Sequence, residues 1–304
     1  MNKVIASAVY GAPKLAEIPA GARQVSPLAP GADALEDAAD ASLGSVVIAA
    51  PPGAIERRYV LAQALRALKP GGELAAVAPK DKGGLRLRKE LEAFGCVVAE
   101  QALRHQRLCR CLRPEAPSGL AEAIAAGGPQ TPPRLGLSSQ PGVFSWDRPD
   151  PGSALLARHL GGLAGRGADL GCGVGVLALA LLASPKVTAL ALVDIDRRAI
   201  DAARRNVADP RASFLQADLR EPLPALSDLD FAVMNPPFHD GGGEDRALGQ
   251  AFIVRAAASL RRGGVLRLVA NIGLPYEATL AGAFDQLRRL EQFAGYKVLE
   301  GRRT

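Results

Sequence analysis

The sequence of 304 residues contains no apolar run long enough to cross a lipid bilayer. Its longest run, Val174 to Ala183, has roughly half the length of a membrane-spanning helix. The four cysteines form no CxxC pair and the three histidines are scattered, which argues against a zinc site and for free thiols. A short apolar stretch at residues 3–12 is broken by Ser7 and Tyr10 and predicts a first strand rather than a secretory signal. We therefore expect a cytoplasmic protein without a metal site or a membrane segment.

The remaining composition is that of an ordinary globular protein. Apolar residues make up 48% of the chain, which is long enough for two domains with sizeable cores. The net charge of +6 is compatible with an anionic partner and leans toward the first half. A stretch rich in Gly, Pro and Ser at residues 127–142 predicts an interdomain linker. We therefore expect one domain at residues 1–128 and a second at residues 129–304.

The second half of the chain alternates short apolar runs with helical patterns. Leu248, Phe252, Ala256 and Leu260 lie four residues apart and predict the buried face of one helix. The final stretch has two runs around Ala294 and Gly295 and predicts a closing antiparallel hairpin. The runs that read as strands are residues 166–170, 186–193, 212–217, 228–234 and 264–270. This alternation is typical of an α/β, doubly wound parallel sheet, whose ligands bind beyond the carboxyl ends of the strands.

The first half repeats part of this plan. The segment "VVIAAPPG" (residues 46–53) parallels "FAVMNPPF" (residues 231–238), and "LKPGGELAAVAP" (68–79) parallels "LRRGGVLRLVAN" (260–271). A third match joins residues 99–113 to the C-terminal hairpin, in the same order. The first copy has no glycine-rich turn after an acidic strand end, and Ala50 stands where the second copy has Asn235. We therefore expect a smaller, degenerate α/β domain, with the chemistry in the second copy.

The second copy opens with "ADLGCGVGVLALAL", in which a strand ending at Asp169 is followed by Gly171, Gly173 and Gly175. Glycines allow a tight turn and a close approach of the backbone to a ligand. The spacing differs from the G-x-G-x-x-G of nicotinamide enzymes. Asp194 ends the next strand, where a carboxylate can accept both ribose hydroxyls, and Asp218 follows a third strand. Three acidic strand ends on one rim suit a nucleoside with a cationic appendage.

These motifs, with "NPPFHDG" and "QPGVFSWDRPDPGSALL" (residues 140–156), resemble class I S-adenosylmethionine-dependent methyltransferases. More narrowly, residues 140–304 look like the ribosomal RNA small-subunit guanine-N2 methyltransferase family. The resemblance implies a Rossmann-like catalytic domain that uses S-adenosyl-L-methionine, preceded by a methyltransferase-like domain that has lost its cofactor site. It implies ribosomal RNA or the small ribosomal subunit as partner, and we expect a monomer. The cofactor-binding residues that it implies are Asp169, Gly171, Gly173, Gly175, Asp194, Ile195, Asp218, Leu219 and Asn235.

The resemblance also implies that catalysis depends on Asn235, Pro236, Pro237 and Phe238. An exocyclic amine is a poor nucleophile because its lone pair is delocalised into the ring. The side-chain oxygen of Asn235 and the carbonyl of Pro236 can each accept one N–H, while the two prolines hold these acceptors in place. Phe238 offers a face on which an extruded base can stack. Positioning then supplies most of the catalysis, and no metal is required.

Other residues have weaker claims. Phe144 and Ser153 precede the cofactor strand and are expected to line the methionine end of the site, although "VFSW" can equally be packing. A basic series in the first domain supplies candidates for phosphate contacts, although such a series also suits a solvated face. It comprises Arg86, Arg88, Lys89, Arg104, Arg107, Arg110 and Arg113.

Three alternative functions stay open at this point. The first is a protein-glutamine methyltransferase, because the amide nitrogen of glutamine is an equally poor nucleophile for an Asn-Pro-Pro site to orient. Such enzymes usually have Tyr where Phe238 stands. An adenine-N6 methyltransferase comes next. A non-catalytic RNA-binding or ribosome assembly factor would retain the fold without needing the acidic strand ends.

Overall fold

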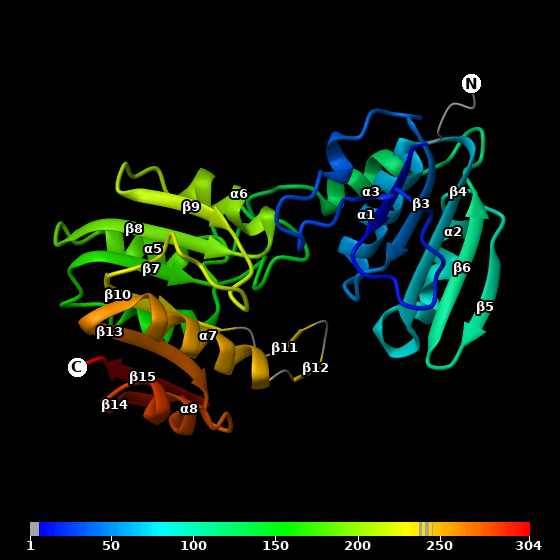
Figure 1. Ribbon diagram of the computed structural model, residues 1–304. Helices are drawn as coiled ribbons and strands as arrows, with labels where there is room; N and C mark the ends of the chain where they lie inside the picture. The colour runs from blue at the N-terminus through cyan, green and yellow to red at the C-terminus, as the bar shows by residue number, and fades with distance from the viewer. Residues whose placement is uncertain (1–5, 237–238, 241–242, 245) are drawn as a thin grey trace. The chain divides into compact units, whose positions relative to one another are not determined.

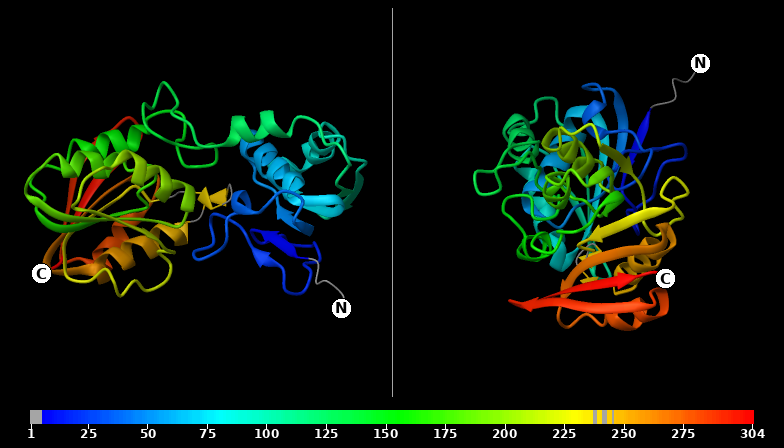
Figure 2. Two further views of the ribbon diagram at one scale, coloured as in Figure 1. Left: turned by 90° about the horizontal axis from the view of Figure 1, so that it is seen from above. Right: turned by 90° about the vertical axis from the view of Figure 1, so that its left-hand side faces the viewer.

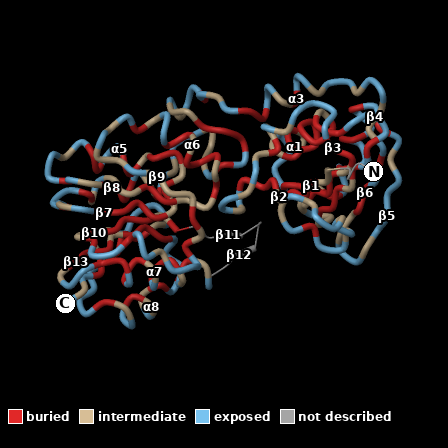
Figure 3. The backbone as a smooth tube through the Cα atoms, turned by 45° about the horizontal axis from the view of Figure 1, so that its top comes forward, coloured by how far each residue is buried: buried red, intermediate tan, exposed pale blue. Residues whose placement is uncertain are grey.

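The computed structural model describes residues 6–236, 239–240, 243–244 and 246–304. The chain divides into two compact units, Met1–Pro129 and Gln130–Thr304, each with its own sheet and apolar core (Figures 1 and 3). Within the described residues, no helix is both long and apolar enough to span a membrane.

The sheet of the second unit has the strand order β14-β15-β13-β10-β7-β8-β9. The five strands from β13 to β9 run parallel, whereas β15 pairs antiparallel with both β13 and β14. Their bounds are β7 Gly165–Leu170, β8 Val187–Asp194, β9 Ala212–Gln216, β10 Leu229–Met234, β13 Leu260–Asn271, β14 Gln286–Phe293 and β15 Tyr296–Arg302. A separate short pair is β11 His239–Asp240 with β12 Gly243–Glu244. The predicted doubly wound sheet with a C-terminal hairpin is confirmed.

Helices cover both faces of this sheet (Figure 2). On one face lie α4 Pro151–Ala157, α5 Val176–Leu182 and α6 Arg197–Asn206, and on the other lie α7 Arg246–Ser259 and α8 Tyr276–Ala283. Alternate strand residues face opposite cores, because successive side chains of a strand point to opposite sides. Phe231 and Val233 pack with α4 and α5, whereas Ala232 and Met234 pack with α7. A Cβ at Gly167 of β7 would lie 2.1 Å from the ring of Phe231 on the neighbouring β10, so glycine is required at this position.

One local expectation was wrong. Leu260 is the first residue of β13 rather than part of the buried face of α7, because the Arg-Arg-Gly-Gly segment after it continues as extended chain. The segment predicted as a linker contains the boundary between the two units, at Pro129 and Gln130. Its later part packs onto the second unit, where Leu135 and Leu137 contact a small core around Val143. The side chain of Asn206 fixes it there through hydrogen bonds with both the N–H and the carbonyl of Ser138.

The sheet of the first unit has the order β2-β1-β3-β4-β6-β5, the same arrangement as β8-β7-β10-β13-β15-β14. Its helices are α1 Ala54–Ala67, α2 Leu87–Glu92 and α3 Leu120–Gly127, with short 3-10 helices at Leu35–Asp37, Lys80–Lys82 and Gly84–Arg86. Its strands are β1 Ser7–Tyr10, β2 Arg23–Gln24, β3 Leu43–Ala49, β4 Leu68–Pro79, β5 Ala99–Leu103 and β6 Gln106–Leu112. The predicted smaller α/β domain before the larger one is confirmed.

The ladder registers show the duplication in detail. Leu43 pairs with Leu68 and the register then shifts, as it does after Leu229 and Leu260 in the second unit. A matching arginine also fixes each hairpin: Arg113 donates to the carbonyl of Leu65 and Arg303 to that of Ala257. In the ladders, the pair Val46–Leu74 of the first unit corresponds to the pair Ala232–Leu266 of the second. Three residues further along each strand, Ala49 is therefore level with Asn235, whereas the sequence match indicates Ala50.

The described residues of the first unit form helices on one face of its sheet only. Between β1 and β3 the described chain holds only β2 and the 3-10 helix at Leu35–Asp37, with no counterpart of α5 or α6. Instead, Glu17 and Pro19 of the long segment that connects β1 to β3 line a hollow together with Val47 of β3 and Ala75 of β4. The layer that carries the glycine-rich turn in the second unit is therefore absent from the described part of the first.

Candidate active site

The carboxyl ends of β10, β7 and β8 lie side by side at one edge of the second sheet. Asp169 lies near the end of β7, Asp194 is the last residue of β8, and Asn235 directly follows β10. These three residues are far apart in the sequence, and the parallel order brings their strand ends together. This edge is where open α/β sheets bind ligands.

The glycine-rich turn connects β7 to α5. Gly171, Gly173 and Gly175 all have positive φ, at 77°, 53° and 91°. A Cβ at Gly175 would lie 2.9 Å from Val207, so this position excludes a side chain by space as well as by conformation. The N–H of Gly173 donates to Asp194 Oδ2 at 2.9 Å, which ties the turn to the end of β8. The turn therefore has a fixed shape that brings backbone close to the edge of the sheet.

Asp169 is a fully buried carboxyl group. Its exposed fraction is 0%, and neither Oδ1 nor Oδ2 has a hydrogen-bond partner within the described residues. Burial, followed by the nearby charge of Asp194, raises the pKa of Asp169 from 3.8 to about 7. An ionised carboxylate in this position requires a compensating positive charge, and a bound cation would supply it.

Asp194 is hydrogen-bonded but also perturbed. Its Oδ1 accepts from the N–H of Asp196 at 2.9 Å, in addition to the bond from Gly173. Desolvation is the largest influence and raises the pKa of Asp194 to about 6, although these backbone N–H groups oppose the rise. Each carboxylate oxygen has two lone pairs, so both can accept a further hydroxyl. The next residue, Ile195, is half-buried, and its carbonyl accepts from the side chain of Gln216.

Asp218 and Leu219 follow β9 at the outer part of the same edge. The Asp218 carboxylate accepts from both Nε and Nη2 of Arg220, at 2.9 and 2.7 Å. This side-chain hydrogen bond lowers the pKa of Asp218, so the group is ionised and already has a cationic partner. Leu219 is 3% exposed and packs in the core between the sheet and α7. Any contact that Asp218 makes with a ligand must therefore share the carboxylate with Arg220.

Asn235 has an asymmetric environment. Its Nδ2 donates to Asp150 Oδ2 at 2.8 Å and to Ser153 Oγ at 2.9 Å, whereas its Oδ1 is buried without a partner in the described chain. Pro236 is buried beside it. The predicted Pro237 and Phe238 lie outside the described residues. The structure thus gives Asn235 one free hydrogen-bond acceptor at the edge of the sheet.

A hollow at this edge contains several of the predicted residues together. Gly171, Gly173 and Asn235 line it, as do Phe144 and Ser153 from the segment before β7. Phe144 is 60% exposed, so it stands at the wall of the hollow rather than in the core. Sequence reasoning did not single out Asp150, which also lines the hollow. The order Asp-Pro at the start of a helix is an N-cap signature that marks this residue, but only as a cap.

In the first unit, the buried side chain of Arg57 occupies the corresponding edge of the sheet, next to the carboxyl end of β3. Arg57 is 1% exposed, and its guanidinium forms two hydrogen bonds of 2.7 Å with Glu90. Its Nη1 donates to the carbonyls of Pro51 and Pro52, at 3.1 and 2.8 Å. The carbonyls of Pro51 and Pro52, which follow β3 as the Asn-Pro-Pro segment follows β10, are therefore occupied inside the protein.

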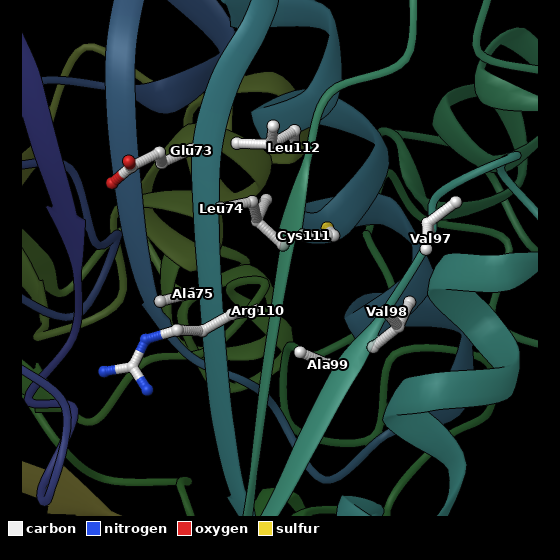
Figure 4. Close-up of a pocket in the computed structure, with 9 residues that line it drawn as sticks. All are labelled: Glu73, Leu74, Ala75, Val97, Val98, Ala99, Arg110, Cys111 and Leu112. Carbon is white, nitrogen blue, oxygen red and sulfur yellow. The ribbon is translucent and has the colours of Figure 1, made fainter.

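A hollow in the first unit lies at the opposite end of its sheet (Figure 4). It is lined by residues 73–75 of β4, residues 110–112 at the end of β6 and residues 97–99 at the start of β5. It therefore does not correspond to the hollow of the second unit. Three of the predicted phosphate contacts have partners within the first unit: Arg113 donates to the Leu65 carbonyl, Arg107 pairs with Glu100 and Arg88 pairs with Glu92. All seven phosphate contacts stay predictions.

Comparison with known proteins agrees with this geometry. Residues 134–300 match the family described as methyltransferase small domain. Ribosomal RNA small subunit methyltransferase C of Pseudomonas aeruginosa (strain LESB58) is 35% identical over 254 residues, covering 81% of this chain and 75% of that protein. The protein of the same name from Pseudomonas paraeruginosa (strain DSM 24068 / PA7) is 34% identical, covering 90% of this chain and 84% of its own.

A solved structure is similar over both units. It is the T. Thermophilus 16S rRNA N2 G1207 methyltransferase (RsmC) in complex with AdoMet and guanosine, with a TM-score of 0.75 and 31% identity. It covers 89% of this chain, and this chain covers 76% of it. The chain belongs to the ribosomal RNA small subunit methyltransferase C family.

Membership of this methyltransferase family confirms the resemblance inferred from the motifs. The family model begins just inside the second unit, whereas the alignments to methyltransferase C proteins extend into the first. The prediction of an enzyme is confirmed, against the alternative of a non-catalytic assembly factor. Among the residues of this chain that the structure describes, no group of His, Cys, Asp or Glu side chains is arranged to hold a metal ion.

Proposed function

We propose that this methyltransferase transfers a methyl group from S-adenosyl-L-methionine to the exocyclic N2 amine of a guanine in 16S ribosomal RNA. The observation that carries the proposal is the buried, unpaired Oδ1 of Asn235, in the same hollow as the glycine-rich turn. The related T. Thermophilus enzyme is named for N2 methylation of 16S rRNA and was solved with AdoMet and guanosine.

The residues at the sheet edge fit this cofactor. S-adenosylmethionine supplies a methyl group on a cationic sulfonium and also carries an ammonium group. The two unpaired oxygens of Asp169 provide the negative charge that such a cation requires. Gly171, Gly173 and Gly175 let the backbone approach the methionine portion, and Asp194 accepts the ribose hydroxyls. Ile195, Asp218 and Leu219 follow the ends of the two outer parallel strands, where the adenine would lie.

Asn235 and Pro236 orient the nucleophile. The Asn235 Oδ1 accepts one N–H of the guanine amine, and the Pro236 carbonyl accepts the other. With both hydrogens held, the lone pair of the nitrogen points toward the methyl carbon. S-adenosyl-L-methionine, when bound, would supply the methyl group and would leave as S-adenosylhomocysteine, and the proton displaced from N2 would pass to water. Pro237 and Phe238 belong to the same proposed catalytic segment, with Phe238 stacking on the extruded base.

The proposal extends to the setting of the enzyme. We propose a cytoplasmic location, because the proposed substrate is small-subunit RNA, with ribosomal RNA or the small subunit as partner. Every residue of the proposed site comes from the second unit of one chain, so a monomer has a complete site. The first unit is proposed as a degenerate methyltransferase domain, because Arg57 occupies the carbonyls at the corresponding edge. RNA binding by its basic residues is part of the same proposal.

The experiment that tests this function is transfer of labelled methyl from S-adenosylmethionine to separated small and large ribosomal subunits that lack the modification. Nucleoside analysis then identifies the product. We expect label in N2-methylguanosine from the small subunit. Label in the large subunit would contradict the choice of RNA. Label in protein would instead indicate the glutamine reaction, and label in N6-methyladenosine would indicate the adenine reaction.

A further inference from the structure

The side-chain amide of Asn235 can face its surroundings in two ways, and only one suits a donor such as an amine. An Asn side chain presents an oxygen that accepts and an NH₂ group that donates. If the oxygen faced the protein, the substrate would meet two N–H donors. The orientation of this amide therefore decides which kind of atom the site can bind.

Two residues at the start of α4 determine that orientation. Asp150 and Ser153 lie 85 and 82 residues before Asn235 in the chain, and both contact its Nδ2. An ionised carboxylate only accepts hydrogen bonds, so a reversed amide would place Asn235 Oδ1 against Asp150 Oδ2. That arrangement is repulsive and would leave the Nδ2 without these two acceptors. The chemistry of Asp150 thus selects one of the two amide orientations.

The start of α4 is itself held in place. Asp150 is the N-cap, and its Oδ2 accepts from the N–H of Ser153 at 2.7 Å, while Pro151 occupies the first helical position. A Cβ at Gly152 would lie 3.0 Å from both Asp150 Oδ2 and the ring of Tyr296. The helix end therefore packs closely against the C-terminal hairpin. Such support keeps the two acceptors at a fixed distance from Asn235.

We propose that Asp150 and Ser153 are positioning residues that hold the Asn235 amide with its oxygen toward the substrate, so that the site selects an N–H nucleophile. This inference rests on the proposed function. It deepens that function by assigning the selectivity for an amine to a contact outside the Asn-Pro-Pro segment.

The rival role for the same residues is binding of the cofactor, because both line the hollow with the glycine-rich turn. The two roles predict different measurements. A positioning residue changes the turnover of bound substrate and leaves the dissociation constant of S-adenosylmethionine unchanged. A cofactor ligand weakens that dissociation constant by about tenfold or more, the loss expected when a hydrogen bond to a charged group is removed.

The test uses the full chain with three substitutions. Asp150→Ser keeps a good N-cap but is too short to reach Asn235, so it separates capping from positioning. Asp150→Asn keeps an oxygen acceptor of the same length, and Ser153→Ala removes the second contact alone. Asp147→Ser is the matched control, because Asp147 lies in the same segment and pairs with Arg148.

We expect Asp150→Ser to lower kcat by about ten- to a hundredfold and Ser153→Ala by about three- to tenfold, with cofactor binding by calorimetry within about twofold of wild type. Asp150→Asn should recover most of the activity, and Asp147→Ser should match wild type. A cofactor affinity weakened about tenfold in Asp150→Ser, or wild-type kcat in both Asp150→Ser and Ser153→Ala, would overturn the proposal.

Nuclear magnetic resonance of the side-chain amides gives a readout that does not depend on activity. The Asn235 Nδ2 signal is assigned by its absence in Asn235→Ala. We expect it to be protected from exchange in wild type and to shift and lose protection in Asp150→Ser. An unchanged signal would refute the positioning role. Failure of the wild-type enzyme to form N2-methylguanosine would instead refute the proposed function, and the amide signal would still test the contact.

Discussion

Replacing Asp169 with Asn should make the protein without cofactor more stable at alkaline pH than at acidic pH, relative to wild type. Burial raises the pKa of Asp169 from 3.8 to about 7, a difference of about three units. At 1.36 kcal/mol per unit, ionising this group in the folded state costs about 4 kcal/mol. The folded state binds the proton more tightly, so the contribution of Asp169 to stability is greatest below about pH 4 and falls as the pH rises to about 7.

The amide that replaces the carboxyl group in Asp169→Asn cannot ionise, so this fall should be missing from the variant. We expect the difference in unfolding free energy, variant minus wild type, to increase by up to about 4 kcal/mol between about pH 4 and pH 8. The buried amide has its own cost, which is independent of pH, and for this reason the change with pH is the quantity to compare. Urea unfolding followed by circular dichroism at both pH values measures it.

Asp230→Asn is the control with the opposite sign. Desolvation opposes ionisation of Asp230, but the backbone N–H of Arg166 and the side chain of Arg261 prevail and lower its pKa. This carboxylate therefore stabilises the fold at neutral pH, and its contribution is lost as the pH falls. A difference between Asp169→Asn and wild type that stays constant from about pH 4 to pH 8 would refute the reasoning about Asp169.

Three further substitutions test other parts of the structure. Asn235→Ala should abolish methyl transfer while calorimetry shows nearly unchanged binding of S-adenosylmethionine; normal turnover by the variant would rule out its assigned role. Asp194→Ala should weaken cofactor binding by more than about tenfold, since buried polar partners are left unpaired; an unchanged dissociation constant would contradict the ribose contact. Arg57→Met should lower the unfolding free energy by about 3 to 5 kcal/mol, because Glu90 would keep an uncompensated buried charge. Adding Glu90→Leu should restore part of that loss, and a more severe double variant would argue against the charge as its cause.

Much of the fold could be predicted from local sequence signals. Alternating strands and helices indicated the doubly wound sheet, and the matches around Gly71 and Gly263 indicated the duplication. These signals are readable because hydrophobic periodicity and turn chemistry act over a few residues. The exact level of a strand is less readable: "PP" aligned Ala50 with Asn235, while the hydrogen-bond ladder places Ala49 there. Register depends on pairing with a neighbouring strand, which a single segment does not reveal.

The candidate site divides in the same way. The sequence by itself determined the glycine turn, the acidic strand ends and the Asn-Pro-Pro segment, because each requires particular residue types at close spacing. Only the tertiary structure decided which way the Asn235 amide faces, since its two partners lie at the start of a helix 85 and 82 residues away. It also decided that Arg57 closes the corresponding edge of the first unit. Hydrogen bonds between distant segments depend on packing geometry, which local composition does not encode.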